Sequence, residues 1–173
     1  MAEQREAIIR FDIRTILALM AFAAIAAAGI ASATQGWSYV FDSLLVLLLG
    51  GSLVASAFCI GSRRAFWFAL FVFTLLYLLA THNSLKPLGI RGLPTNTWIR
   101  NTMNRLHPAI THVENRSRRG VPYKATVIEP NPKAYVGSQI GYKSMAIVVG
   151  LIAAYISRAL YVIAQRRVEA TSD

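Results

Sequence analysis

Two histidines and one glutamate are the side chains of this sequence that could come together to hold a catalytic metal ion. His107 and His112 lie five residues apart, Glu114 follows two residues later, and His82 stands further upstream. Imidazole and carboxylate groups are good zinc ligands, so this set would suit a metal-dependent enzyme acting on anionic lipid or envelope substrates. However, Pro108 separates the first pair, and no HExxH motif or cysteine cluster accompanies them. Exposed or lightly packed histidines are the simpler interpretation, and we expect no metal or other cofactor.

The sequence shows no motif of the other common enzymatic or transport chemistries. It contains no GxSxG, P-loop or dinucleotide-binding motif, and its single cysteine, Cys59, has no partner for an intrachain disulfide. None of the eight carboxylates lies inside an apolar run, where proton-coupled transporters usually place Asp or Glu. We therefore expect a protein that is not an enzyme, and keep the metal-dependent enzyme as the alternative.

The composition indicates a protein whose solvent is lipid. Of the 173 residues, 55% are hydrophobic and only 15% are charged, and the apolar residues form long runs. Such runs could not be hidden in a water-soluble domain of this size. The net charge of +10 sits at the ends of these runs and in one polar segment. This arrangement favours anionic lipid headgroups as partners and argues against nucleic acid.

Four apolar runs predict an all-α membrane protein with four transmembrane helices, at residues 13–33, 44–61, 65–80 and 145–164. The predicted organisation has three parts. Residues 1–81 hold the first three transmembrane helices, residues 82–143 form a polar segment outside the bilayer, and residues 144–173 hold the fourth helix and a tail.

The polar segment contains all six prolines of the chain, which predicts largely irregular structure. A short amphipathic helix is expected within it, ended or bent by Pro108, because apolar residues recur at helical spacing at Ile99, Met103, Leu106, Ile110 and Val113. Residues 123–129 are a candidate strand. Gly137 and Gly141 indicate a flexible entry to the fourth run.

The distribution of basic residues predicts the orientation. They gather around the start of the first run, between the second and third, and after the fourth, at Arg5, Arg10, Arg14, Arg63, Arg64, Arg166 and Arg167. Short basic loops stay in the cytoplasm, so both termini are expected there, with residues 82–143 extracytoplasmic. Cleavage after Ala33, which ends an Ala-Ser-Ala triplet, is the alternative to a retained first helix; the length of the run favours retention.

Small residues at four-residue spacing predict the helix contacts, because close approach holds membrane helices together. One such row in each of three runs is expected to face another of these rows or a partner: Ala24, Ala28 and Ser32; Gly51, Ala55 and Cys59; Ala146, Gly150 and Ala154. Arg158 continues the last row. Because it lies near the cytoplasmic end of its run, we expect its side chain to snorkel to lipid headgroups.

The strongest local charge in the polar segment is the cluster Arg116, Arg118, Arg119 and Lys124. Either it forms a solvated loop, or it contacts anionic lipid headgroups or an acidic partner. The leading hypothesis is a non-enzymatic membrane subunit or scaffold, in which the outer segment engages a protein partner or anionic lipid.

Several short motifs in this order resemble a family of small bacterial multi-pass membrane proteins with no assigned activity. They are Phe11-Asp12-Ile13-Arg14-Thr15, Arg63-Arg64-Ala65-Phe66-Trp67, Leu93-Pro94-Thr95, Ile140-Gly141 and Ser157-Arg158-Ala159-Leu160-Tyr161. The resemblance implies a bacterial cytoplasmic membrane and the same number of helices. Relatives often carry His after the Ile-Gly pair, where this chain has Tyr142, so a His-based role does not carry over to this position.

Overall fold

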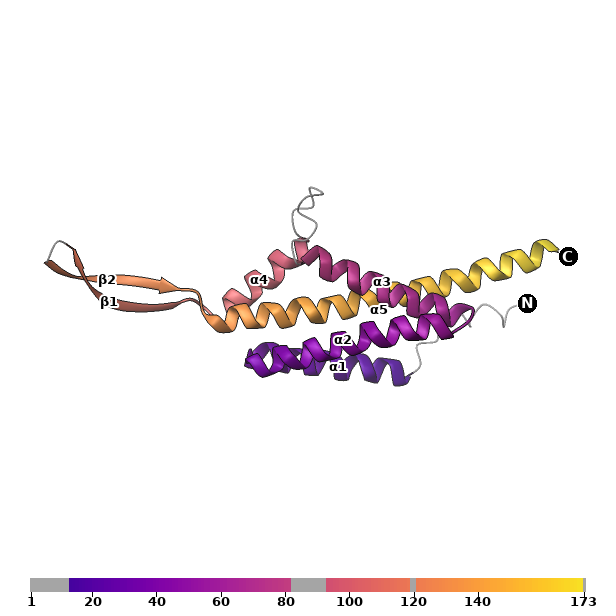
Figure 1. The fold of residues 1–173 in the computed structure, drawn as a ribbon, viewed down its shortest axis with the longest axis horizontal. Helices are drawn as coiled ribbons and strands as arrows, with labels where there is room; N and C mark the ends of the chain where they lie inside the picture. Colours follow the sequence, from indigo (N-terminus) through magenta and orange to yellow (C-terminus); the bar gives the residue numbers. More distant parts are fainter. Residues whose placement is uncertain (1–12, 82–92, 119–120, 173) are drawn as a thin grey trace.

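The computed structural model describes residues 13–81, 93–118 and 121–172. Helices dominate it, and a single hairpin of two strands is the exception (Figure 1). In chain order the elements are α1 (Ile13–Ser32), α2 (Gln35–Phe58), α3 (Ser62–Thr81), α4 (Pro94–Leu106), β1 (Ile110–Arg118), β2 (Val121–Glu129) and α5 (Pro132–Ser172).

Among the described residues, α2, α3 and α5 are long and apolar enough to cross a membrane. The described apolar part of α1, Leu17–Ser32, is shorter. The prediction of a helical membrane protein is therefore confirmed in its coarse form, whereas a fourth membrane-spanning helix stays a prediction.

The long helix α5 is the element against which the others pack. Helices α1, α2 and α3 run back and forth beside it, and α4, set at an angle to α3, descends toward the start of α5 and packs against its first half (Figure 1). With 41 residues, α5 is about 60 Å long at 1.5 Å per residue, roughly twice the thickness of a hydrocarbon core. It therefore extends well beyond its apolar stretch, and the predicted boundary at residue 144 falls inside this one helix.

The tightest helix contact is the crossing of α3 and α5. Ala146 and Ala154 on α5 have no exposed surface. Between them, a side-chain carbon added at Gly150 would overlap Thr74 of α3 and press on Leu70. In lipid, helix association depends on such close packing of small residues. This row brings the backbones of α3 and α5 together.

The small residues predicted to pack on α1 and α2 do not form the buried faces of these helices. Ala24 and Ala28 are exposed, and a carbon added at Gly51 would meet nothing within 4 Å. These two rows therefore do not face each other within the described chain, and contact of either row with a partner stays a prediction. The buried positions lie elsewhere: Ala26 on α1, Ala33 directly after it, and Ser38, Phe41, Leu45, Ser52 and Ser56 on α2.

Helix α1 packs loosely against the rest of the bundle. Ala26 belongs to a buried cluster with Phe41 of α2 and Ile140 of α5. Toward its beginning, α1 leaves an open apolar groove of about 450 Å³ against α2 and α5, lined by Ala18, Leu19, Phe22, Leu44, Leu48, Ile147, Leu151 and Tyr155.

The prediction of largely irregular structure between residues 82 and 143 was wrong, because the prolines mark the ends of regular elements. Pro94 and Pro132 occupy the first helical positions of α4 and α5, where a missing N–H costs nothing. Pro108 follows the end of α4, as predicted, and strand β2 contains the predicted strand at residues 123–129. Residue 87, another of the prolines, lies outside the described residues.

The predicted amphipathic helix is present, but its apolar stripe is shorter than expected. Ile99 and Met103 are buried, whereas Ile110 and Val113 lie on β1 and are exposed. Gly137 and Gly141 are not a flexible entry. They lie within α5, where a carbon added at either would overlap Met103 or Ile99 of α4.

We expect the substitution Gly150→Leu to destabilise the bundle by about 1–3 kcal/mol, the usual cost of overpacking a filled contact. The matched control is Gly51→Leu, since nothing lies within 4 Å of that position. Thermal unfolding in detergent, followed by circular dichroism, compares the two variants. Equal melting temperatures for both would contradict the α3–α5 crossing.

Candidate interaction site

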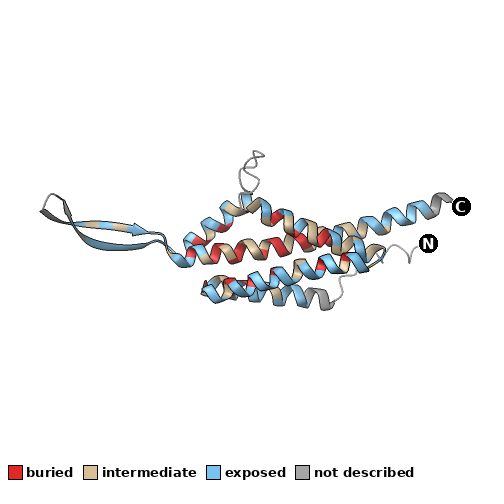
Figure 2. Ribbon diagram, viewed as in Figure 1, coloured by how far each residue is buried: buried red, intermediate tan, exposed pale blue. Residues whose placement is uncertain are grey.

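The hairpin of β1 and β2 projects from the helical bundle at the end opposite to the C-terminus of α5 (Figure 1). Its strands pair antiparallel from Ile110↔Glu129 to Arg118↔Val121. Nine residues at about 3.3 Å each make it roughly 30 Å long. No described side chain of either strand is buried (Figure 2). The hairpin is therefore held only at its base.

The base of the hairpin is fixed to α5 by Asn131. Its side-chain oxygen accepts a hydrogen bond from the Lys133 N–H at 3.0 Å, which caps the first turn of α5. Its side-chain nitrogen donates to the carbonyl oxygen of Pro108 at 3.2 Å. One side chain thus joins the segment before β1 to the helix that follows β2, and sets how the hairpin leaves the bundle.

Helix α4 braces the first half of α5. Ile99 and Met103 pack on its two glycines, and Tyr142 Oη of α5 donates to the Asn96 carbonyl oxygen at 3.4 Å. At the N-terminal end of α4, the hydroxyls of Thr95 and Tyr77 of α3 lie 3.0 Å apart. Tyr142 thus makes a structural contact.

The predicted basic cluster lies on the hairpin, but the strand register divides it. Arg116 shares a face of β1 with His112 and Glu114, because side chains alternate along a strand. Its Nε donates to Glu114 Oε2 at 2.9 Å. Lys124 stands opposite Asn115 and so belongs to the other face. Arg118 ends the ladder; its side chain lies outside the described residues, as does Arg119.

The candidate metal ligands are not brought together. His107 ends α4, with its Nε2 3.5 Å from the Ile30 carbonyl oxygen of α1, whereas His112 and Glu114 are exposed on β1. Within residues 13–81, 93–118 and 121–172, no three His, Cys, Asp or Glu side chains could hold a metal ion together. His82 lies outside the described residues.

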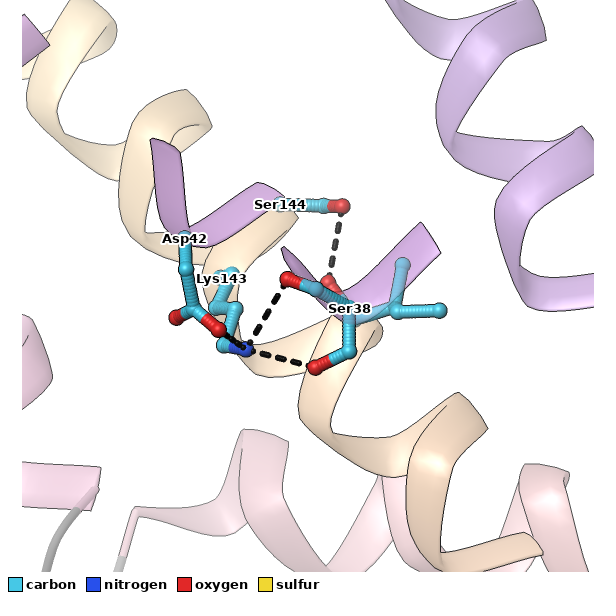
Figure 3. A network of polar contacts seen from close by, with 5 residues as sticks. Ser38, Asp42, Lys143 and Ser144 are labelled. Carbon is cyan, nitrogen blue, oxygen red and sulfur yellow. Dashed lines mark hydrogen bonds and ion pairs between the residues drawn. The ribbon is translucent and has the colours of Figure 1, made fainter. Parts of the chain in front are cut away.

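A polar network that the sequence did not predict joins α2 to α5. Lys143 Nζ donates to Asp42 Oδ2 at 2.8 Å and to Ser38 Oγ at 2.9 Å, and lies 3.4 Å from the Ser38 carbonyl oxygen (Figure 3). The Lys143 side chain is only 12% exposed, against 53% for Asp42. These acceptors can occupy all three ammonium donors, so the network serves to hold the helices rather than to bind a headgroup.

Arg158 is exposed on the second half of α5, the half that is remote from the hairpin. Three residues further on, Tyr161 lies close to Gly61, at the turn between α2 and α3. Snorkelling of the Arg158 side chain to lipid headgroups stays a prediction. The exposed position of this residue is suited to it.

No family model matches the chain, and no curated protein or solved structure is similar to it. The resemblance to small bacterial membrane proteins therefore stays a prediction.

We expect Asn131→Ala to weaken both the cap of α5 and the base of the hairpin, at a cost of about 1 kcal/mol. Amide hydrogen exchange at Lys133 and Ala134 should become faster, and a nitroxide label at position 126 should become more mobile. Asn131→Asp is the matched control: its carboxylate still accepts from Lys133 but cannot donate to Pro108, so only the label should change. If the label is as mobile in both variants as in the wild type, Asn131 does not fix the base of the hairpin.

Proposed function

We propose that the chain is a non-enzymatic membrane subunit or scaffold that presents the β1–β2 hairpin to a protein partner. The observation that supports it best is the isolation of the hairpin. Two-stranded hairpins are marginally stable in water unless something packs against them. No described element of this chain covers either face, so a partner is the natural source of that contact.

The orientation we propose places the hairpin outside a bacterial cytoplasmic membrane, with four spanning helices and both termini in the cytoplasm. Arg63 and Arg64 at the start of α3, and Arg166 and Arg167 near the end of α5, belong to the end of the bundle remote from the hairpin. Basic residues in short loops and tails favour the cytoplasmic side. Residues 82–143 would then be extracytoplasmic.

A protein partner fits the geometry better than the lipid headgroups of the chain's own membrane. The tip of the hairpin lies about 30 Å beyond the start of α5, along the direction in which the helices run. Electrostatic attraction between exposed charges fades over about 8 Å at physiological salt. The basic residues near the tip are therefore too remote to bind those headgroups, whereas an acidic protein surface could reach them.

The metal-dependent enzyme is the weaker proposal. His107 is directed toward α1, while His112 and Glu114 stand on the projecting hairpin, where exposed charges would hold a metal poorly. Metal analysis of the purified protein separates the two proposals, because the enzyme requires a stoichiometric metal ion.

The test is affinity purification from native membranes in mild detergent, with mass spectrometry of co-eluting proteins. We expect a reproducible partner with the full chain, and its loss when residues 110–129 are replaced by a Gly/Ser linker. Replacing residues 169–172 at the remote end with the same linker is the control and should retain the partner. A set of co-eluting proteins that does not depend on the hairpin would contradict the proposal.

A further inference from the structure

The two long edges of the hairpin differ in their capacity to accept another strand. The sheet has two strands in the described part of the chain, so each strand has one edge without a strand neighbour. If the hairpin binds a protein partner, as the proposed function requires, this difference determines which edge binds the partner and what conformation the bound segment has.

The strand register identifies the backbone groups that face outward. Pro122 pairs with Ser117 and has no N–H, so this pair must be of the class that exchanges no hydrogen bonds across the hairpin. The two classes of pair alternate along an antiparallel ladder. Asn115↔Lys124, Val113↔Thr126 and Thr111↔Ile128 therefore belong to the same class, with their N–H and C=O groups turned away from the partner strand.

This assignment leaves β1 with an uninterrupted edge, whereas the edge of β2 is bounded by a proline at each end, with Lys124, Thr126 and Ile128 turned outward between them. On β1 the outward backbone groups belong to Thr111, Val113, Asn115 and Ser117. None of these residues is a proline, so each directs one N–H donor and one C=O acceptor away from β2. On β2 the outward row loses a donor at Pro122, and Pro130 follows the strand directly. Proline is a usual means of protecting an edge from pairing, and here it protects only one edge.

We propose that the outer edge of β1 accepts an extended acidic segment of the partner protein as a third strand. Main-chain hydrogen bonds to a free edge are an established mode of peptide recognition. The charge of the hairpin selects the partner: residues 110–129 contain four basic residues and only Glu114 and Glu129 as acids. An acidic strand would meet complementary charge over the half of β1 next to the turn, which contains Arg116 and Arg118.

A second copy of this chain is the less suitable occupant. Copies in one membrane share one orientation, so their β1 strands run in the same direction away from the bundle. The antiparallel pairing of β1 with β1, the more stable ladder, is therefore out of reach between neighbours. An extended segment of another protein can approach in either direction.

The experiment uses the full chain in phosphatidylcholine nanodiscs. The probe is a blocked nine-residue peptide of alternating threonine and glutamate, followed by fluorescence anisotropy. We expect saturable binding, with slower amide hydrogen exchange at Thr111, Val113, Asn115 and Ser117 on addition of the peptide. A polyglutamate peptide of equal charge, which forms no strand, and anionic vesicles should bind more weakly and leave those amides unprotected.

A pair of proline variants separates edge pairing from charge attraction. Val113→Pro removes an outward N–H from β1, while Thr126→Pro removes the equivalent one from β2 in the same cross-strand pair. We expect about tenfold weaker binding for Val113→Pro, from the lost hydrogen bond and the distorted edge, and little change for Thr126→Pro. Circular dichroism and the exchange of inward amides check that both hairpins remain formed.

The inference is overturned if the peptide does not bind, if both variants bind equally, or if polyglutamate or anionic vesicles bind as well as the strand-forming peptide. These outcomes differ from failure of the proposed function. A partner that depends on the hairpin in native membranes but is retained by Val113→Pro would support the scaffold function. It would also show that the β1 edge is not the binding surface.

Discussion

The structure depends on the length of one helix. A backbone that crosses lipid must satisfy its own hydrogen bonds, and a continuous helix does this wherever it passes between lipid and water. Because α5 runs for 41 residues, it is long enough to cross a membrane with its apolar part and to continue as a stalk before it. Helix α3 packs on the row of Ala146, Gly150 and Ala154 in the apolar part, and helix α4 packs on Gly137 and Gly141 in the stalk.

Polar groups of the described chain fall into two kinds, and the difference indicates where function lies. Lys143 is nearly buried and is engaged by Ser38 and Asp42, so it holds α2 against α5. On the hairpin, by contrast, Lys124 is exposed on a ribbon that no described helix covers. Interactions of the first kind specify the fold, whereas the exposed charges and the free backbone edge of the second kind are available to another molecule.

The sequence was sufficient to predict the lipid environment and the approximate position of the apolar runs, because these depend on composition over many residues. It was not sufficient for features set by contacts between distant residues. The beginning of α5 at Pro132 and the pairing of β1 were missed, because all the prolines were read as signs of irregular structure. The Lys143–Asp42 pair was missed because Asp42 precedes the apolar run predicted at residues 44–61, although it lies two turns inside α2. Its four-residue spacing from Ser38 was the available signal.

The central claim is that α5 is one rigid helix that carries the hairpin away from the membrane. Pulsed electron–electron resonance in lipid nanodiscs tests it most directly, with spin labels at the exposed positions Tyr135→Cys and Gln165→Cys in a Cys59→Ser background. Thirty residues of continuous helix predict a narrow distance distribution near 45 Å. A broad distribution, or a main distance below about 35 Å, would show that the helix breaks at the membrane surface and would contradict this account.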